Sequence, residues 1–234
     1  MIDIGSCFNY GIEQIKKNPA FYIGGILVVM GISIGINLVA QGFSFIWGLA
    51  VGFLSHSLNL DGSIGGILAM GGGAIIGIVL GFLIAPFFVG YFKGLKKEYE
   101  GGTGEIGDVF SGFGIMVPSI LNYAVANLVV VAGFICCIIP GILLSPIIMM
   151  TVFFLAKEKT DGLTAVKSSW GLLKKNPIII LWYYILTIFG MLGLILCIVG
   201  IVITVPISLA AMYKMFQQAL GEDNPVPAAP AAKV

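Results

Sequence analysis

The sequence contains no arginine, a single histidine and few charged residues of either sign. Charged residues make up 10% of the 234 residues, whereas soluble domains carry about 25%. Because all twelve basic residues are lysine, the rigid bidentate clamps that arginine forms with phosphate or carboxylate are excluded. The net charge of +1 gives no indication of a nucleic-acid partner. Hydrophobic residues make up 59% and the mean hydropathy is +1.07, which is more apolar surface than a soluble core can bury.

Several apolar runs are long enough to cross a bilayer, which takes about 20 residues. They predict an all-α integral membrane protein with six transmembrane helices, over residues 20–40, 64–92, 115–135, 141–156, 178–196 and 198–216. A further apolar run, 43–54, could form a seventh span. We interpret it as an interfacial helix or an extension of the first span, because a seventh crossing would move the lysines that follow residue 92 to the opposite face.

With six crossings, every lysine falls on one face of the membrane, and flanking lysines mark the cytoplasmic side. We therefore expect a multi-pass protein of the inner (cytoplasmic) membrane with both termini cytoplasmic. The first residues lack the basic region, apolar run and cleavage site of a signal peptide, so the first span is expected to direct targeting. Residues 1–220 are predicted to form a single membrane domain, and the Pro- and Ala-rich residues 221–234 a flexible cytoplasmic tail.

The tetrapeptide KKNP occurs twice, at 16–19 and 174–177, each time before an apolar run. Prolines recur in the same register, which predicts three repeated helical hairpins over about residues 3–98, 105–158 and 160–220. Each hairpin is preceded by a short segment with apolar residues at helical spacing, which predicts an amphipathic helix on the cytoplasmic side. Because proline removes a backbone hydrogen bond, we expect kinks in the return helices at Pro86, Pro146 and Pro206.

The amphipathic helices are expected to lie in the cytoplasmic headgroup layer with their lysines toward anionic lipid. The candidates for this lipid-facing basic surface are Lys16, Lys17, Lys96, Lys97, Lys167, Lys174 and Lys175.

The stretch GDVFSGFG, an apolar hairpin containing IIPGILL, and TAVKSSWGLLKKNP follow one another in the sequence. Together they resemble a widespread set of uncharacterised prokaryotic six-helix polytopic membrane proteins, similar to the membrane domain found ahead of some glycerophosphodiester phosphodiesterases. The resemblance is best over residues 104–177. It implies the six-helix fold and indicates no mechanism. We expect no phosphodiesterase domain, because the chain lacks the acidic and histidine residues of that chemistry.

Few residues point to chemistry. Asn122 and Asn127 are candidates for a polar lining, although hydrogen bonds between helices are the simpler interpretation. Cys137 and Cys197, at expected outer turns, are candidates for a disulfide or for small buried apolar side chains. No ionisable side chain is expected in the middle of a span, which argues against ion-coupled transport. A Ser–His–acid set, a zinc spacing and a phosphate loop are absent from the sequence, so we expect no enzyme, no cofactor and no metal.

These patterns predict a non-enzymatic integral membrane protein that organises lipid or partner proteins. Membrane lipid is the expected partner, with other membrane proteins as further candidates and no nucleic acid. Small residues on one helix face, Gly73, Gly77 and Gly81, favour close helix packing within the bundle or in a homo-oligomer. Two alternatives stay open: an uncoupled channel or carrier for a small neutral or apolar solute, and an accessory subunit of a larger membrane complex.

Overall fold

The computed structural model describes residues 2–59, 61–157, 163–193 and 197–222, and within these ranges every regular element is a helix. Among these described residues, five helical segments are long and apolar enough to cross a membrane. A sixth is present if α8 (Thr164–Lys175) and α9 (Ile178–Leu192), which meet at 103°, form one broken span. The prediction of an all-helical fold with several apolar helices of membrane-spanning length is thus confirmed, with five or six candidate spans among the described residues. The predicted tail lies outside the described residues from residue 223 onward.

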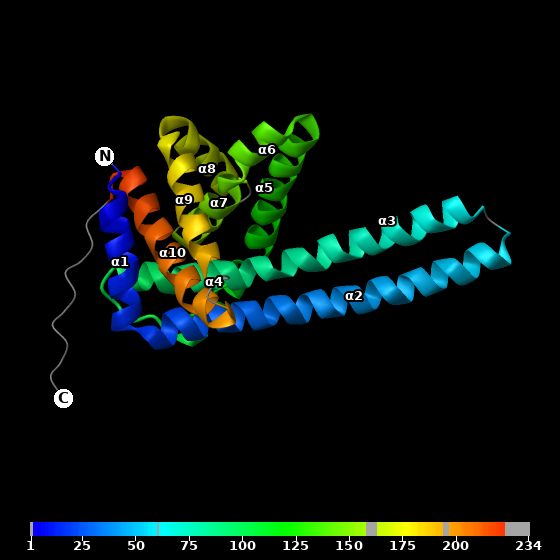
Figure 1. Ribbon diagram of the computed structural model, residues 1–234, viewed down its shortest axis with the longest axis horizontal. Coiled ribbons are helices and arrows are strands. Elements are labelled where there is room, and N and C mark those ends of the chain that lie inside the picture. Colours follow the sequence, from blue (N-terminus) through cyan, green and yellow to red (C-terminus); the bar gives the residue numbers. More distant parts are fainter. Residues whose placement is uncertain (1, 60, 158–162, 194–196, 223–234) are drawn as a thin grey trace. The chain divides into compact units, whose positions relative to one another are not determined.

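Residues 30–84 form one compact unit, a hairpin of two long helices. α2 (Gly25–Ser57) runs unbroken for 33 residues and enters this unit, where α3 (Gly62–Gly81) returns beside it (Figure 1). At the tip, the carboxylate of Asp61 accepts a hydrogen bond from the Ser63 backbone N–H at 2.9 Å and caps α3. The apolar run 43–54 lies inside α2, so it extends the first helix and forms neither a separate interfacial helix nor a seventh span.

Small residues allow α2 and α3 to approach each other closely. A Cβ atom at Gly72 would overlap the indole of Trp47, whose Nε1–H donates a hydrogen bond to the Leu68 carbonyl at 3.1 Å. Gly73 faces α2 as well, because its carbonyl accepts a 3.1 Å hydrogen bond from the Ser44 hydroxyl. The other two members of the predicted glycine face differ: a Cβ atom at either position, 77 or 81, would meet no described atom within 4 Å.

The second unit comprises residues 1–29 and 85–234, and its core is aromatic. It is built from α4 (Ala85–Tyr99), α7 (Pro146–Lys157) and the C-terminal half of α10 (Cys197–Leu220). Phe153 of α7 joins the three helices, since its ring centroid lies 4.7 Å from that of Phe92 and 5.3 Å from that of Phe216. The rings of Phe92, Phe153 and Phe216 are fully buried, so these contacts fix the three helices against one another.

Burial of the three return helices begins at their prolines. Pro86, Pro146 and Pro206 are buried, and the helix that follows each proline lies largely inside the core. A 3-10 turn, η2 (Phe82–Ile84), comes just before α4, and α6 (Ile138–Leu144) ends two residues before Pro146. Pro206 lies inside the continuous α10. Two of the three prolines therefore stand at the start of a helical segment, where a missing N–H is tolerated, and the kinks themselves stay a prediction.

The two KKNP copies adopt the same local structure. Asn18 ends α1 (Ile4–Lys17) with φ −137° and ψ 66°, and Asn176 ends α8 with φ −132° and ψ 73°. Each asparagine N–H donates a 2.9 Å hydrogen bond back into the helix before it, to the carbonyl of Gln14 or of Leu172. The proline that follows begins the next helix, where its missing N–H costs nothing. The repeated motif is therefore a helix stop joined to a helix start.

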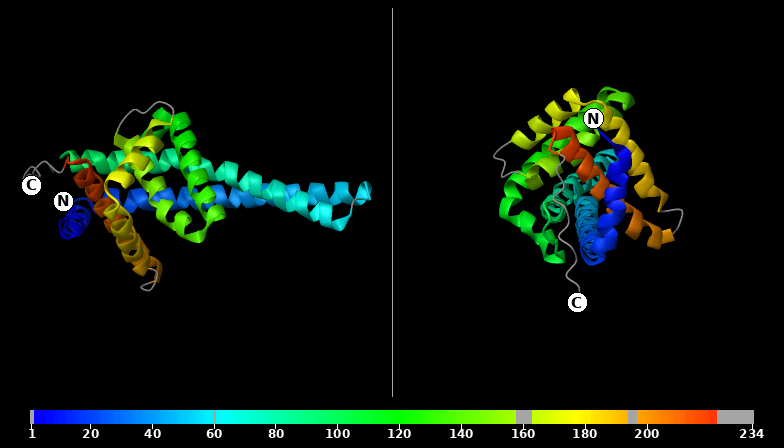
Figure 2. Two further views of the ribbon diagram at one scale, coloured as in Figure 1. Left: turned by 90° about the horizontal axis from the view of Figure 1, so that it is seen from above. Right: turned by 90° about the vertical axis from the view of Figure 1, so that its left-hand side faces the viewer.

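The segments that precede the hairpins pack against protein. α1 lies beside α10, as Figure 1 and Figure 2 both show, and a Cβ atom at Gly11 would come within 2.6 Å of the Ile207 carbonyl oxygen. η3 (Ile106–Ile115) packs on α4 so tightly that a Cβ atom at Gly112 would overlap the carbonyl oxygen of Pro86. α8 packs on α7. Each segment thus places part of its apolar surface on its own core, which reduces the surface available to lipid.

Candidate functional site

A basic pocket of about 300 Å³ lies where α4 and α7 end. Lysines in the last turn of these helices are favourable because the carbonyl end of a helix carries a partial negative charge. Four of the twelve lysines line the pocket, together with one acid and three apolar residues: Lys93, Lys96, Lys97, Glu100, Ile115, Leu155, Ala156 and Lys157. The pocket therefore combines concentrated positive charge with an apolar wall.

The ammonium groups of the basic pocket are held by weak and replaceable partners. Lys96 lies 3.7 Å from the carboxylate of Glu100, and Lys157 forms an ion pair with Glu222. These two carboxylates are 61% and 53% exposed, and exposed ion pairs contribute little to stability. Lys96 also donates a 3.1 Å hydrogen bond to the Lys157 carbonyl. A multiply charged anion could replace the exposed carboxylates without leaving a buried group unpaired.

The other two lysines of the basic pocket, Lys93 and Lys97, contact residues of η3. Lys93 donates a 3.2 Å hydrogen bond to the Ser111 carbonyl, and Lys97 lies 3.5 Å from the Asp108 carboxylate. A lysine ammonium is a compact charge with three N–H donors, so several lysines can contact one phosphate group from different sides. The apolar wall, from Ile115 and Leu155, is suited to the glycerol or acyl part of a lipid rather than to a free ion.

The structure separates the predicted basic surface into groups. Lys96 and Lys97 line the basic pocket, whereas the lysine pairs of the two KKNP copies are exposed at the ends of α1 and α8. In the second copy, the Lys174 ammonium lies 4.9 Å from the centre of the exposed Trp170 ring, and Lys167 lines an apolar hollow with the same tryptophan. The seven predicted lysines therefore do not form one site.

Sequence reasoning omitted two lysines of the basic pocket, Lys93 and Lys157. One of them had a signal in the sequence. Lys97 follows Pro86 by eleven residues, and Lys157 follows Pro146 by eleven residues. Both lysines thus stand eleven residues after a return-helix proline, and both line the same pocket in the structure. Lys93 had no comparable signal, because its position depends on the packing of η3 on α4.

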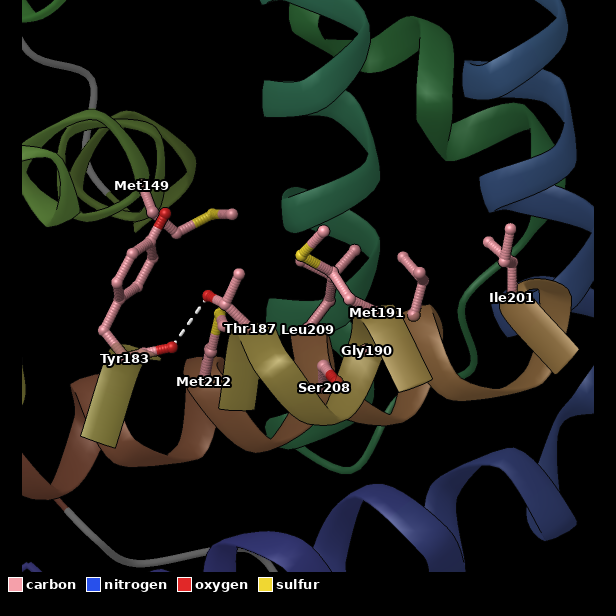
Figure 3. Close-up of a pocket in the computed structure, with 10 residues that line it drawn as sticks. Met149, Tyr183, Thr187, Gly190, Met191, Ile201, Ser208, Leu209 and Met212 are labelled. Atoms are coloured by element: carbon pink, nitrogen blue, oxygen red, sulfur yellow. Dashed lines mark hydrogen bonds between the residues drawn. The ribbon is translucent and has the colours of Figure 1, made fainter. Parts of the chain in front are cut away.

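An apolar groove of about 230 Å³ runs along α9 and α10 (Figure 3). Three flexible methionines contribute to its wall: Met149, Met191 and Met212. Two of its hydroxyl groups bond within their own helix: Thr187 donates to the Tyr183 carbonyl at 2.7 Å and Ser208 to the Thr204 carbonyl at 3.0 Å. An adaptable groove with a mostly apolar lining is suited to hydrocarbon.

The two asparagines predicted as a polar lining are bonded within their own helix, α5 (Met116–Cys136). Asn122 is fully buried and donates to the Pro118 carbonyl at 2.9 Å, while its Oδ1 accepts from the Val166 N–H of α8 at 3.4 Å. Asn127 donates to the Tyr123 carbonyl at 2.8 Å. Neither lines the basic pocket or the apolar groove. The interhelical bond of Asn122 matches the simpler interpretation of this residue.

The predicted disulfide lies partly outside the described residues. Cys137 lies exposed just after α5, next to the equally exposed Cys136, and neither thiol forms a disulfide with a described residue. The side chain of Cys197 is not among those described, so its pairing with Cys137 stays a prediction. Within the described part of the chain, His, Cys, Asp and Glu side chains do not come together in a group of three that could hold a metal ion.

Comparisons of this chain with protein-family models, with curated proteins and with solved structures find no match. The resemblance to uncharacterised six-helix membrane proteins therefore stays a prediction from the sequence motifs.

Proposed function

We propose that this protein is a non-enzymatic integral membrane protein that binds anionic lipid through the basic pocket and thereby organises lipid or partner proteins, as a homo-oligomer. The observation that carries the proposal is the gathering of four lysines and an apolar wall at the ends of two membrane-length segments. Basic pockets between membrane helices at the cytoplasmic face are suited to phospholipid headgroups. The apolar groove on α9 and α10 offers a second surface for hydrocarbon.

The proposal includes the three-hairpin repeat and a cytoplasmic position for the lysine-rich face of an inner membrane. Three observations support the repeat: the matched backbone angles of the two KKNP asparagines, the burial that starts at each return-helix proline, and the aromatic core shared by α4, α7 and α10. The lysines at the ends of α1, α4, α7 and α8 support the orientation, because flanking lysines are retained on the cytoplasmic side.

The channel or carrier alternative has less support. It relied on a polar path, and the amides of its two candidate residues, Asn122 and Asn127, are used inside the protein. The accessory-subunit alternative makes a separate prediction: a foreign protein would be retained in stoichiometric amount when the chain is purified from native membranes in mild detergent. Mass spectrometry of everything that stays bound distinguishes this outcome from a homo-oligomer that retains only lipid.

The direct test compares two triple variants that lose the same charge. The first removes three of the four lysine charges of the basic pocket: Lys93→Gln, Lys96→Gln and Lys157→Gln. The control, Lys16→Gln, Lys17→Gln and Lys175→Gln, removes three exposed lysines elsewhere. Binding of the protein in nanodiscs to a fluorescent phosphatidylglycerol is measured against phosphatidylcholine. At about 1 kcal/mol for each lysine, the pocket variant should lose affinity for the anionic lipid by about 150-fold.

The control variant is expected to keep most of its preference for phosphatidylglycerol. An equal loss in both variants would mean that general surface charge attracts the lipid and that the pocket is not a site. Wild-type protein with no preference for the anionic lipid would contradict the proposal altogether. Excess inorganic phosphate serves as a further competitor: displacement of the lipid at low millimolar phosphate would indicate that a free anion, and not a headgroup, is the natural ligand.

A further inference from the structure

A row of polar side chains runs along the first 22 residues at every fourth position: Tyr10, Gln14, Asn18 and Tyr22. The first two lie on α1, Asn18 ends that helix, and Tyr22 lies in η1 (Ala20–Gly24), a single π-helical turn. Within α1, this spacing places Tyr10 and Gln14 on one helix face. Turns of π-helix are rare and are found preferentially at functional sites.

Glu98, near the end of α4, is the buried counterpart of this row. It is 3% exposed, and it is the only acidic or basic side chain that is buried in the described part of the chain. Its Oε1 accepts hydrogen bonds from the Asn18 side-chain amide at 2.5 Å and from the Gly104 N–H at 2.6 Å. Among the described residues, no lysine forms an ion pair with it. The carboxylate thus receives two donors and no balancing charge.

Three members of this row carry a buried oxygen atom without a hydrogen-bond partner among the described residues, and the charge of Glu98 acts on two of them, Tyr10 and Tyr22. The hydroxyls of Tyr10 and Tyr22 are buried and lie near each other, and neither has a partner in full hydrogen-bond geometry within the described residues. The Oε1 atom of Gln14, one turn along α1 from Tyr10, is buried and unpaired as well. Burial, and next the charge of Glu98, raise the pKa of Tyr10 above its usual range, so its phenol stays neutral at physiological pH.

Unpaired oxygens beside a lone buried carboxylate are costly unless something completes the site. The atoms that could act as metal ligands here are all oxygens, and oxygen ligands bind hard cations. A single carboxylate balances one positive charge, which favours a monovalent over a divalent ion. One internal alternative is the Lys214 ammonium, which lies 5.4 Å from the centre of the Tyr10 ring and forms no ion pair with Glu98.

We propose that Glu98, together with the hydroxyl oxygens of Tyr10 and Tyr22, holds a monovalent metal cation at the π-turn between α1 and α2. Asn18 and the Gly104 N–H orient the carboxylate, and the ion balances its charge. The bound ion joins three stretches of the chain: the middle of α1, the π-turn and the end of α4. Glu98, Tyr10 and Tyr22 are not among the residues that line the basic pocket, so the inference does not depend on lipid binding.

The first experiment measures the thermal unfolding of the full-length protein in detergent, with lithium, sodium, potassium or choline chloride at one ionic strength. We expect at least one alkali cation to raise Tm saturably above the value in choline, because a ligand that binds only the folded state stabilises it. Equal Tm values in all four salts would overturn the proposal.

Paired variants then locate the effect. Glu98→Gln should abolish the difference between the alkali cation and choline, whereas Glu100→Gln, which removes the same charge from an exposed neighbour, should keep it. Tyr22→Phe removes one oxygen ligand and should weaken the apparent cation affinity about tenfold even if Glu98→Gln fails to fold. A cation response retained in Glu98→Gln, or unchanged affinity in Tyr22→Phe, would refute the site. Lys214→Met should leave the response intact; its loss would assign the counter-charge to the lysine instead.

Discussion

Replacement of Gly112 by alanine tests the contact that holds η3 against α4. A Cβ atom at this position would overlap the Pro86 carbonyl oxygen and would lie 2.8 Å from the Gly90 backbone nitrogen. Both obstructing atoms belong to the backbone of α4, so no side chain can rotate away to relieve the overlap. The two elements must separate, and the well-packed surface between them must open. Gly114→Ala is the matched control, because a Cβ atom there would meet nothing within 4 Å.

The expected size of the effect follows from the difference between the two variants. Each exchange of glycine for alanine reduces the entropy of the unfolded chain by a similar amount, worth about 0.4–1 kcal/mol of stabilisation. Because this contribution is common to both variants, it cancels in the comparison. What remains is the cost of overpacking, about 1–3 kcal/mol. For a chain of this length, that corresponds to a Tm about 2–12 °C lower for Gly112→Ala than for Gly114→Ala.

Thermal unfolding in one detergent, followed by intrinsic tryptophan fluorescence, measures this difference. Both variants are compared at the same scan rate, because membrane proteins that unfold irreversibly report a rate-dependent Tm. If Gly112→Ala is as stable as Gly114→Ala, η3 does not pack on α4 through this glycine, and the arrangement of the rim of the basic pocket described above is wrong.

Three further predictions concern the motif asparagine, the hairpin tip and the orientation in the membrane. Asn18→Ala should destabilise the protein by about 1–3 kcal/mol, because it deprives a buried carboxylate of a donor, while Asn9→Ala, at an exposed site of the same helix, should change little in a urea titration. The backbone N–H and then the hydroxyl of Ser63 lower the pKa of Asp61. The stabilisation that Asp61 gives as a helix cap is therefore present above about pH 4 and is lost as the pH falls through the lower pKa of the folded state. Acid unfolding followed by circular dichroism should show this decline in the wild type and not in Asp61→Asn. In a variant with Cys137 as its single cysteine, a membrane-impermeant maleimide should label the protein in intact cells. A single cysteine placed instead on the lysine-rich face should react only after the membrane is opened. The reverse pattern would contradict the proposed orientation.

Hydropathy was sufficient to predict the helices, because burial in a bilayer requires long apolar runs whatever their tertiary partners. The limits of the first helix were harder to predict. Charge patterning argued against a crossing by residues 43–54, and it could not distinguish an interfacial helix from an extension. That choice depends on packing: the Trp47 indole bonds to the Leu68 carbonyl, which keeps this run paired with α3.

The chemistry of the two sites was less accessible from the sequence. Glu98 lies beyond the predicted end of the second span, so the expected lack of ionisable side chains in the middle of the spans did not concern it. Its burial depends on Asn18, eighty residues earlier in the chain, and on Gly104 after the helix. The four-residue spacing from Tyr10 to Tyr22 was the available signal. Polar periodicity could identify this row of side chains, whereas only the fold could identify Glu98 as its partner.

The length of α2 has a consequence for the membrane around it. Its 33 residues span about 50 Å at 1.5 Å per residue, whereas the hydrocarbon core of a bilayer is about 30 Å thick. To lie wholly within that core the helix would need a tilt of about 53°, beyond the usual limit of about 40°. A tilt of about 25–35° suffices if both ends reach the headgroup layers, which bring the total to about 40–45 Å. The tip, where Phe53 is 77% exposed and Leu54 54% exposed, then presents apolar rings and chains to the opposite headgroup layer. This hydrophobic mismatch favours a locally thickened bilayer around the hairpin, so the protein would concentrate in the thicker regions of its membrane.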